Sequence, residues 1–458
     1  MPAKKHHPTH PPKPHPPLPL PVFHEPVFNE DQQIVVPPQF LTPHPSDGKL
    51  YASLGNLLST QTTQFDKSRV ADGEMLELAA AYGDHGPELI QQIQQAKQIV
   101  FHALGDSGAI TAGVKYQNEL NVTEQLSADC HTSDATNHPA FLYHLGDVVY
   151  DFGEEQYYYD QFYDAFRNYP CPIFAIPGNH DSFITTGTAP ENEPLKIFER
   201  NFCSPDWVIT PEARSLHRTA MIQPGVYFTL DAPFVRIIGL FSNALEDPGV
   251  ISSENGKWSR VPDYQLSYLK AQLAAIKHQK YAGAVLLAVH HPPFSYAPPT
   301  TGAGTGGNHG GSPHMLAQID TICKQAGVYP HAILSAHAHN YQRYTRTVKM
   351  NGAAYDVPFV VCGDGGHHVN PLTHAAKGKP SQEPAFGADV SYLDRKPVIP
   401  TGGLILEKYD DSSYGYLRIT VDAQQLRIGY QQVGKASLAQ SRFDLVTVDI
   451  ASHTMVSN

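Results

Sequence analysis

Five short apolar runs in this chain each end in a cluster of glycine, acidic, amide or histidine residues, and this recurrence constrains the fold more than any other feature. The runs are QIVFHAL (98–104), AFLYHL (140–145), PIFAI (172–176), GAVLLAV (283–289) and HAILS (331–335). The clusters that follow them are GDSG (105–108), GDVVY (146–150), PGNHD (177–181), HHPPFS (290–295) and AHAHN (336–340). Such runs are typical of buried strands. Because ligand sites in open α/β sheets lie beyond the carboxyl ends of strands, we expect the five clusters to converge.

Helical patterns separate these runs, at 87–98, 154–169, 263–279 and 312–327. The last pattern begins with Ser312-Pro313 and ends at Gly327, which are residues favoured at helix starts and ends. A further apolar run lies at 234–241, and residues 402–433 alternate at period two, which predicts an antiparallel meander. Buried strands that alternate with helices predict an α/β fold with a parallel or mixed sheet.

The sequence predicts four parts along the chain. Residues 1–48 are rich in proline and histidine and predict a disordered tail, and residues 49–96 predict a helical or irregular extension. Residues 97–435 form the predicted main domain, and residues 436–458 a C-terminal extension. The glycine-rich and proline-rich stretch 298–312 is a candidate active-site loop.

Composition excludes some classes of protein. A net charge of -12 argues against a nucleic-acid binder, and the chain has no apolar stretch of the length, about 18 residues, that spans a membrane. The five cysteines, without CxxC spacing, favour buried free thiols over a disulfide framework. The N-terminal residues lack the apolar core of a secretory signal, so the sequence alone favours a cytoplasmic location. The sequence does not fix an oligomeric state. The Asn121 sequon is interpreted as a chance occurrence.

The clusters carry the side chains of a metal site. Asp106 and Asp147 offer carboxylates, Asn179 offers an amide oxygen, and the imidazoles come from His290, His337 and His339. This mixture suits first-row transition metals. The number of donors exceeds what a single catalytic metal with an open coordination position uses. It suits two metals about 3.5–4 Å apart that are bridged by a carboxylate and a hydroxide. Each cluster alone also has a structural explanation, as a turn, a strand edge or a core histidine, and only their joint order favours the metal site.

The ordered motifs GDSG, GDVVY, GNHD, LAVHH and AHAH resemble those of the calcineurin-like metallophosphoesterases, and among them the purple acid phosphatases: GDxG, GDxxY, GNH(D/E), VxxH and GHxH. The resemblance covers roughly residues 97–435. Ala336 replaces a glycine of the family pattern and Leu287 a valine. The N-terminal sandwich domain of plant members has no evident counterpart. The resemblance implies a sandwich of two mixed β-sheets flanked by helices, with a dinuclear metal site at the C-terminal ends of strands.

By matched position, the resemblance implies which side chains hold each metal. The first metal would be held by Asp106, Asp147, Tyr150 and His339, and the second by Asp147 as the bridge together with Asn179, His290 and His337. Many relatives carry a first motif DxH whose histidine binds the first metal. Here Ser107-Gly108 follow Asp106, and Tyr150 is the expected replacement. Because a phenolate favours a trivalent ion, the implied cofactors are Fe(III) and a divalent metal, which is Fe(II), Zn(II) or Mn(II).

The implied reaction is hydrolysis of phosphate monoesters, on small phosphorylated substrates, by a hydroxide that bridges the metals. His180 would contact the phosphate or protonate the leaving group, and Asp181 would orient it, although a purely structural hydrogen bond is the alternative for His180. His291 and His309 are further candidates for substrate contact. His367 and His368 are more readily interpreted as part of an ordinary loop.

Two alternatives stay open at this point. A phosphodiesterase or nucleotide hydrolase would use the same metals with different loops. An inactive binding module would be expected to lack ligands, whereas every ligand position is filled here. Because many family members are exported, the resemblance also leaves a location outside the cytoplasm open.

Overall fold

The computed structural model describes residues 17–24, 75–109, 114–131, 134–150, 152–182, 195–243, 247–258, 261–296, 309–373, 383–434 and 440–456. The predicted disordered tail therefore lies outside the described residues except for 17–24, and the predicted active-site loop is described only from His309 onward. Residues 17–24 contact the domain: the Leu18 N–H donates to the Trp207 carbonyl (2.8 Å), and the Phe23 ring lies 5.2 Å from that of Tyr82. This stretch differs from the solvated coil expected there.

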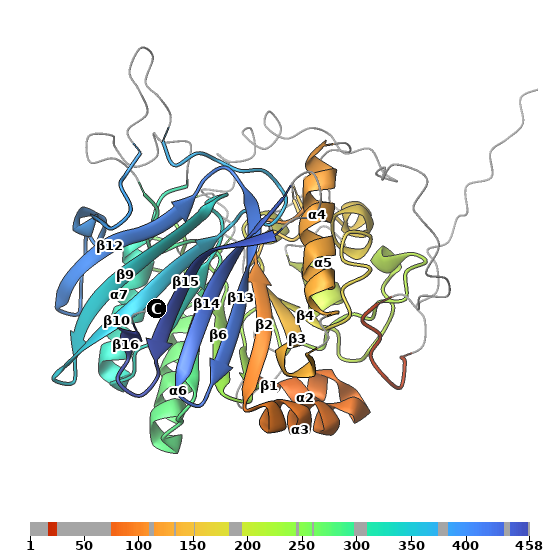
Figure 1. Ribbon diagram of the computed structural model, residues 1–458, viewed down its shortest axis with the longest axis horizontal. Helices are drawn as coiled ribbons and strands as arrows, with labels where there is room; N and C mark the ends of the chain where they lie inside the picture. Colours follow the sequence, from red (N-terminus) through yellow and green to blue (C-terminus); the bar gives the residue numbers. More distant parts are fainter. Residues whose placement is uncertain are drawn as a thin grey trace, which may run out of the picture.

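Two mixed β-sheets face each other in the molecule (Figure 1). The nine-stranded sheet has the order β1-β5-β6-β7-β8-β10-β9-β12-β11, and the seven-stranded sheet the order β16-β15-β14-β13-β2-β3-β4. The strands of the first are β1 (Met75–Glu77), β5 (Thr229–Ala232), β6 (Val235–Leu240), β7 (Ala284–Val289), β8 (Ala332–Ser335), β9 (Tyr341–Met350), β10 (Ala353–Cys362), β11 (Ala388–Asp389) and β12 (Thr401–Asp410). The strands of the second are β2 (Gln98–Leu104), β3 (Pro139–His144), β4 (Ile173–Ala175), β13 (Tyr414–Asp422), β14 (Gln425–Val433), β15 (Gln440–Asp449) and β16 (Thr454–Val456).

Helices flank both sheets. The α-helices are α2 (Leu78–Ala81), α3 (Gly86–Ala96), α4 (Val114–Asp129), α5 (Lys196–Phe202), α6 (Tyr264–Gln279) and α7 (Pro313–Ala326). The short helices are η1 (Gly83–His85), η2 (Ala135–Asn137), η3 (Glu155–Tyr157), η4 (Tyr159–Tyr163), η5 (His180–Ser182), η7 (Pro211–Ala213) and η8 (Ser391–Leu393). In Figure 1, α6 and α7 lie behind the first sheet, and α4 stands beside β2. The predicted sandwich of two mixed sheets flanked by helices is confirmed.

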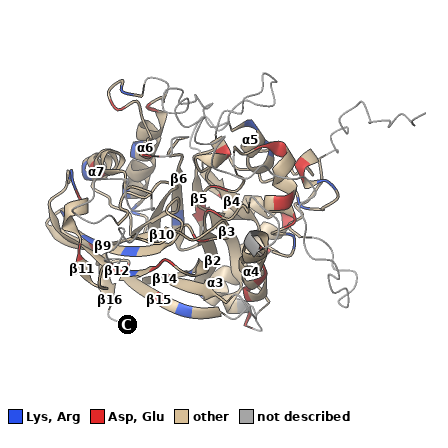
Figure 2. Cartoon of the chain, turned by 90° about the horizontal axis from the view of Figure 1, so that it is seen from above, with Lys and Arg blue, Asp and Glu red and all other residues tan. Residues whose placement is uncertain are grey.

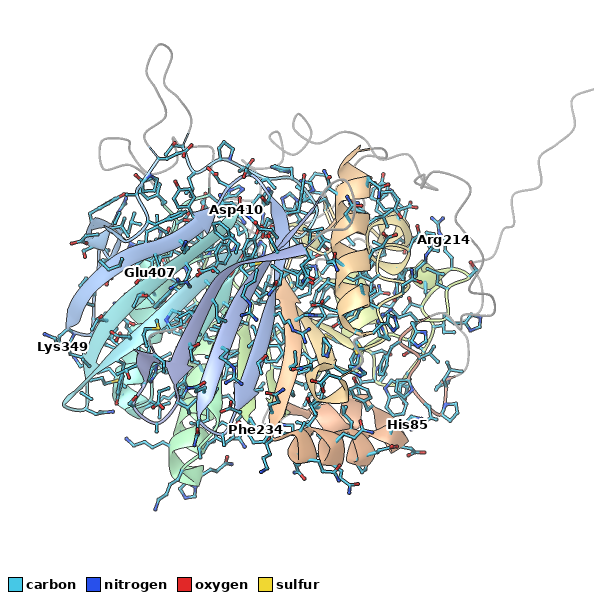
Figure 3. All side chains as sticks on the ribbon, viewed as in Figure 1. His85, Arg214, Phe234, Lys349, Glu407 and Asp410 are labelled. Atoms are coloured by element: carbon cyan, nitrogen blue, oxygen red, sulfur yellow. The ribbon has the colours of Figure 1, made fainter. Side chains whose placement is uncertain are left out.

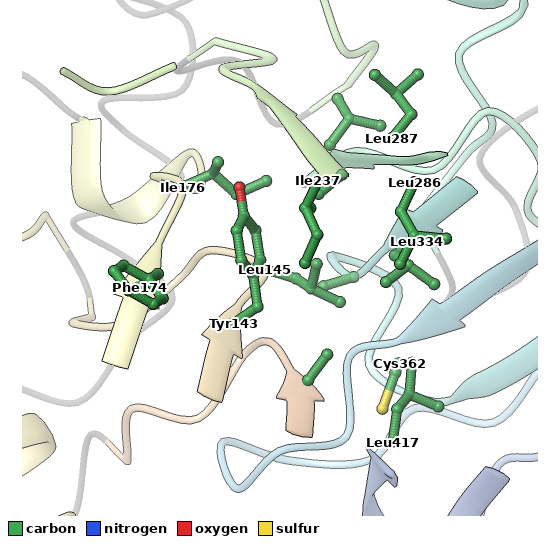
Figure 4. Packing of buried hydrophobic residues seen from close by; sticks show 14 of the residues in the cluster. Tyr143, Leu145, Phe174, Ile176, Ile237, Leu286, Leu287, Leu334, Cys362 and Leu417 are labelled. Carbon is green, nitrogen blue, oxygen red and sulfur yellow. The ribbon is translucent and has the colours of Figure 1, made fainter. Parts of the chain in front are cut away.

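The core lies between the two sheets. Tyr143 and Ile176, from the second sheet and the end of β4, face Ile237 of β6, and all three side chains are fully buried (Figure 4). The sheets approach closely at Gly239, where an added Cβ would lie 2.3 Å from the Tyr143 hydroxyl. Burial of each large apolar side chain contributes roughly 1.5–3 kcal/mol, so this layer is what fixes the strands relative to one another.

The helix predicted over 154–169 forms only in part, and it is not an ordinary α-helix. The chain forms η3 and then the π-helical turn η4, in which the Asp164 N–H donates to the Tyr159 carbonyl, five residues earlier (2.8 Å). The wider turn directs Gln161 inward, where its side chain exchanges two hydrogen bonds with the backbone of Tyr150 (2.8 and 2.7 Å). A tertiary contact to a candidate ligand therefore overrides the helical pattern.

The predicted meander over 402–433 is also wrong in part. Strand β12 pairs with β9 in the first sheet, whereas β13 and β14 pair with each other in the second. The chain crosses between sheets after Asp410, and nothing in the period-two pattern marks that crossing. Residues 440–456, which the sequence analysis set apart as an extension, add β15 and β16 to the second sheet.

Helix α4 was not predicted, because polar side chains are buried on it alongside the apolar ones. Glu119 and Asn121 are buried together with Tyr116, Val122 and Leu126, so the helix has no simple apolar stripe. The Asn121 amide accepts a hydrogen bond from Gln117 (2.9 Å), and the sequon side chain is therefore not open to solvent.

All five cysteines lie in the described part of the chain, are buried, and form no disulfide with one another. Among the helices of the described ranges, none is long and apolar enough to cross a membrane. Acidic and basic residues are interspersed along the chain in Figure 2.

The carboxyl ends of the central strands lie at one end of the molecule. Asp410 pairs with Tyr341, the residue directly after the AHAHN cluster, and lies at the upper end in Figure 3. Phe234, in the turn before β6, lies at the lower end. Strands β6, β7 and β8 are parallel, as are β2, β3 and β4, so the polar clusters meet at the upper end.

At the opposite end, two stacked histidines join the C-terminal hairpin to the first sheet. The rings of His331 and His453 are 4.4 Å apart and nearly parallel. His331 Nδ1 accepts from the Val285 N–H (2.9 Å) and its Nε2 donates to the Ile450 carbonyl (3.1 Å), while His453 Nε2 donates to the Pro330 carbonyl (3.0 Å). Both rings are therefore held neutral. Burial, with the neighbouring His331 ring, lowers the pKa of His453 to about 3, and burial also lowers the pKa of His331.

A histidine whose pKa is lowered by folding stabilises the folded state most at pH values where its imidazole is neutral in both the folded and the unfolded protein. The contribution of His453 should be complete above its ordinary pKa of about 6.5 and be lost as the pH falls toward 3. His453→Asn suits the positive φ of 57° at this position but removes the ring. We expect urea unfolding at pH 7.5 to show the variant about 1–2 kcal/mol less stable than the wild type, with the difference shrinking at pH 4. A difference independent of pH, or an equal change in the exposed control His314→Asn, would contradict this.

Candidate metal centre

The five clusters converge, and the side chains form two adjoining groups. Asp106, Asp147 and His339 place their ligand atoms within 4.8 Å of one another, and so do Asp147, His290 and His337. Asp147 belongs to both groups. This is the arrangement expected of two metal sites that share one bridging carboxylate.

The backbone at these positions is strained in a way that aims the side chains inward. Asp106, Asp147 and His337 have φ values of 55°, 56° and 65°, in the left-handed region that few non-glycine residues adopt. Neighbouring glycines allow the loops to touch: an added Cβ on Gly178 would lie 2.0 Å from Asp147 Oδ1. A Cβ on Gly105 would lie 2.4 Å from that of Ala336, so Ala336 fits in place of the family's glycine because its neighbour is Gly105.

Two carboxylates are fully buried here, and no lysine or arginine of the described residues pairs with either. Within the described residues, the ion pairs of Asp106 and Asp147 are all with histidines: His339 Nε2 lies 3.3 Å from Asp106, and His290 Nε2 lies 3.3 Å from Asp147. Burying a carboxylate costs several kcal/mol unless a nearby cation or proton compensates. The site therefore calls for positive charge that the protein side chains do not permanently supply.

Protons compensate in the metal-free protein. Burial and the nearby charge of Asp147 raise the pKa of Asp106 to about 7, although His290 acts in the opposite direction. Burial would also raise the pKa of Asp147, but His290 and His180 hold it well below its usual range. Burial would lower the pKa of His290, yet the Asp147 carboxylate raises it to about 9. A metal must displace these protons, because only deprotonated ligands bind it.

Tyr150 lies between the two carboxylates. Its hydroxyl donates to Asp106 Oδ1 and Asp147 Oδ2, both at 3.0 Å, and lies 3.4 Å from His339 Nε2. Burial and both carboxylates hold the pKa of Tyr150 well above its usual value, so the phenol stays protonated until a cation binds among these oxygens.

The ring of Tyr150 also occupies the space next to Gly108, the position of the missing DxH histidine. An added Cβ on Gly108 would lie 2.5 Å from Gln161 Oε1 and 3.1 Å from Tyr150 Cδ2. The closest atoms to such a Cβ are Gln161 Oε1 and the Val148 carbonyl oxygen, at 2.5 and 2.6 Å, and the tyrosine ring is in tight contact beyond them. The loop around Tyr150 therefore leaves no room for a larger side chain at position 108 without a local shift.

The second group consists of neutral donors around Asp147. His290 Nδ1 lies 2.9 Å from the Leu145 carbonyl and donates to it, which leaves Nε2 facing Asn179 Oδ1 at 3.0 Å. His337 Nε2 is buried and has no hydrogen-bond partner within the described part of the chain. An orphaned imidazole nitrogen, two buried carboxylates and a mixed nitrogen and oxygen donor set together fit a two-metal centre.

The four predicted catalytic side chains lie around this centre. His180 Nε2 is 4.0 Å from Asp147 Oδ2, its ring is 4.2 Å from that of Tyr150, and its side chain is 12% exposed. His291 Nδ1 lies 2.7 Å from the Ser242 hydroxyl. The rings of His291 and His309 lie 4.2 and 4.0 Å from that of His337. Their contact with substrate stays a prediction.

Asp181 has contacts different from those expected. Its carboxylate accepts hydrogen bonds from the N–H groups of Val148 (3.0 Å), Val149 (3.1 Å) and Gly178 (2.9 Å), so it ties the second polar cluster to the third. These contacts make Asp181 a structural link between two ligand-bearing loops, rather than the orienting partner of His180 that we expected.

Sequence reasoning missed one acidic residue and undervalued two histidines. Asp247, in the loop after β6, groups with His309 and His337 at the partly exposed edge of the site, and its context EDPGV resembles any turn. His367 and His368 group with His339. They follow the apolar run of β10, as the other clusters follow theirs, and that placement was a usable signal.

Comparison with known proteins agrees with the motifs. A family model described as calcineurin-like phosphoesterase matches residues 99–341, a range that contains all the predicted metal ligands. No curated protein matches the chain significantly.

Three solved structures are similar at low sequence identity. The purple acid phosphatase PPD1 isolated from yellow lupin (Lupinus luteus) seeds is 16% identical with a TM-score of 0.48, over 77% of this chain and 54% of that one. GAP50, the anchor in the inner membrane complex of Plasmodium, is 14% identical with a TM-score of 0.44, over 76% and 89%. PhoD is 13% identical with a TM-score of 0.46, over 79% and 72%. The chain thus spans about half the length of the lupin protein.

Because Asp147 belongs to both groups, substitutions of different site residues should change the number of bound metals by different amounts. Asp147→Asn should lose both metals because it weakens both groups, whereas His337→Gln should lose one. Asp247→Asn, which replaces an acidic residue at the exposed edge of the site, should keep both metals. Metal analysis after gel filtration measures these contents. Two metals retained in Asp147→Asn would refute the bridging role, and a metal lost in Asp247→Asn would place a metal at the outer group instead.

Proposed function

Because the chain belongs to the calcineurin-like phosphoesterase family, we propose that it hydrolyses phosphate monoesters at a dinuclear centre of Fe(III) and a divalent metal. The observation that carries the iron assignment is the Tyr150 hydroxyl, placed between two buried carboxylates where Gly108 leaves no room for a histidine. Three oxygen donors that can each carry a negative charge favour a trivalent ion.

The neutral donors of the second group favour a divalent partner. Asn179, His290 and His337 add no charge beyond the shared Asp147 carboxylate. Fe(II), Zn(II) and Mn(II) all accept imidazole and oxygen ligands, so the donor set supports a divalent ion without selecting one of the three.

Substrate binding depends on the same cations. The protein has a net charge of -12, and the described ion pairs of the site carboxylates involve histidines alone. When bound, the two metals would supply an ionised water as nucleophile and neutralise the charge of the phosphate oxygens. The protein then has to hold the ligands in place and deliver a proton to the departing oxygen.

His180 is best placed to deliver that proton. Its backbone N–H donates to Asp147 Oδ1 (2.9 Å), which anchors the residue beside the centre, and its side chain reaches the solvent-facing side. A proton on Nε2 would pass to the leaving alkoxide as the bond from phosphorus to oxygen breaks. His291 and His309, whose rings lie next to that of His337, would contact the phosphate or its ester group.

A visible spectrum tests the metal assignment. Freshly purified protein should contain iron and show a tyrosinate–Fe(III) charge-transfer band, and Tyr150→Phe should lose the band while keeping metal. Tyr344→Phe, which alters another buried tyrosine outside the metal centre, serves as the control and should keep the band. A colourless wild-type protein that holds two zinc or manganese ions would overturn the iron assignment and leave hydrolysis standing.

Turnover of chosen esters tests the reaction and the role of His180. The wild type should hydrolyse 4-nitrophenyl phosphate faster than bis(4-nitrophenyl) phosphate. His180→Ala should lose roughly 10²–10⁴-fold in kcat with an alkyl phosphate, whose poor leaving group needs a proton, and much less with 4-nitrophenyl phosphate.

Two results would change this proposal. A faster rate with the diester would favour the alternative, a phosphodiesterase or nucleotide hydrolase on the same scaffold. An equal loss with both leaving groups would exclude His180 as the general acid and leave it as a phosphate contact. His314→Ala, at an exposed position of α7, is the matched control and should behave as the wild type.

A further inference from the structure

A sixth segment builds this site. The chain leaves β10 as CGDGGHHV (362–369) and runs beside the first polar cluster. The Gly105 N–H donates to the Cys362 carbonyl (3.0 Å), the Gly365 N–H to the Gly105 carbonyl (3.1 Å), and the His367 N–H to the Asp106 carbonyl (3.0 Å). The segment is thus fixed, residue by residue, to the loop that carries Asp106.

The same segment is fixed to the fifth cluster. The Gly363 N–H donates to the Asn340 carbonyl (3.2 Å), and the Asn370 N–H donates to the His339 carbonyl (2.7 Å). Glycine is needed for this approach, because an added Cβ on Gly363 would lie 2.6 Å from Asp106 Oδ2. The segment therefore bridges two of the three loops that supply the proposed first-metal ligands, those of Asp106 and His339.

His367 supports Tyr150. The two rings stack with centroids 3.7 Å apart and planes 10° apart, and His367 Nδ1 donates to the Gly108 carbonyl at 2.7 Å. His367 is 2% exposed, so its ring has little freedom to leave the stack. It packs against one face of the Tyr150 ring. This contact leaves the Tyr150 hydroxyl directed at the carboxylates of Asp106 and Asp147.

His368 supports His339 in a different way. Its Nε2 lies 2.9 Å from His339 Nδ1, while His339 Nε2 faces Asp106 Oδ1 (3.3 Å) and the Tyr150 hydroxyl (3.4 Å). The nitrogen that faces the first metal position is therefore Nε2, and His368 holds the other one. A hydrogen bond at the second nitrogen fixes the tautomer and the ring orientation of a metal-binding histidine.

We propose that His367 and His368 are positioning residues for the first metal, with His367 holding the tyrosine ligand and His368 the histidine ligand. The inference rests on the proposed function. It assigns no contact with substrate to either residue. Its consequence is that the affinity for the first metal, and the energy of the Tyr150 charge-transfer band, depend on side chains that bind no metal themselves.

The test compares His367→Leu and His368→Leu with variants that keep part of each interaction. His367→Phe keeps an aromatic ring against Tyr150, and His368→Gln keeps a hydrogen-bonding group near His339. Chelator competition should show one of the two metals bound 10–100-fold more weakly in both leucine variants, with partial recovery in His367→Phe and His368→Gln. The visible band should shift in His367→Leu and return toward its wild-type position in His367→Phe. His314→Leu, exposed on α7, is the control.

The outcomes separate this inference from the proposed function. A wild-type protein that binds no metal would overturn both. A wild-type protein that binds two metals, with both leucine variants retaining them at wild-type affinity, would overturn the positioning role alone. Equal weakening of both metals, or a similar loss in His314→Leu, would also overturn it, because a general loss of stability would then explain the result. The chelator measurement decides the question whichever metals the protein holds.

Discussion

Two buried carboxylates that have no lysine or arginine partner among the described residues are the constraint on which the rest of the structure depends. Asp106 and Asp147 are fully buried, and their described ion-pair partners are histidines. A proton on His290, whose pKa is raised to about 9, balances part of this charge, and Asp106, whose pKa is raised to about 7, keeps part of its own proton, while the Tyr150 phenol stays neutral. Each of these protons occupies an atom that a metal would otherwise bind, so metal binding would release protons from a fixed set of positions.

Holding such a set requires strain that the core must offset. Three of the proposed ligands have left-handed backbone, at a cost of order 1–3 kcal/mol each, and glycines such as Gly178 bring neighbouring loops closer than a side chain would permit. The packed layer between the sheets, around Tyr143 and Ile237, fixes the strands from which these loops arise. Asp181 then ties two of the loops together through backbone N–H groups. The site is therefore built on rigid strand ends rather than on the loops alone.

The sequence predicted the convergence of the ligands because each lies directly after a buried strand, and that relation is local. It did not predict contacts that depend on distant parts of the chain. The tyrosine-rich stretch 154–169 follows a helical pattern, yet Gln161 is drawn to the backbone of Tyr150 and the helix widens there. Strand β12 alternates like β13, yet it pairs with β9 in the first sheet whereas β13 pairs with β14 in the second. Asp247 has no local signal at all, because its place beside His309 depends on how two loops meet.

The placement of Tyr150, the proposed tyrosine ligand, depends on several positions at once. Gly108 leaves space for the Tyr150 ring, Gln161 holds its backbone, and His367 stacks against its face while donating to the Gly108 carbonyl. A histidine introduced at position 108 would not by itself recreate the DxH arrangement, because its Cβ would collide with Gln161 Oε1 and with the Val148 carbonyl in the loop of Tyr150. A change between the two kinds of first-metal site would therefore require coordinated substitutions in three separate segments. For this reason the residues around Tyr150 carry more information about the metal than the ligands that both kinds of site share.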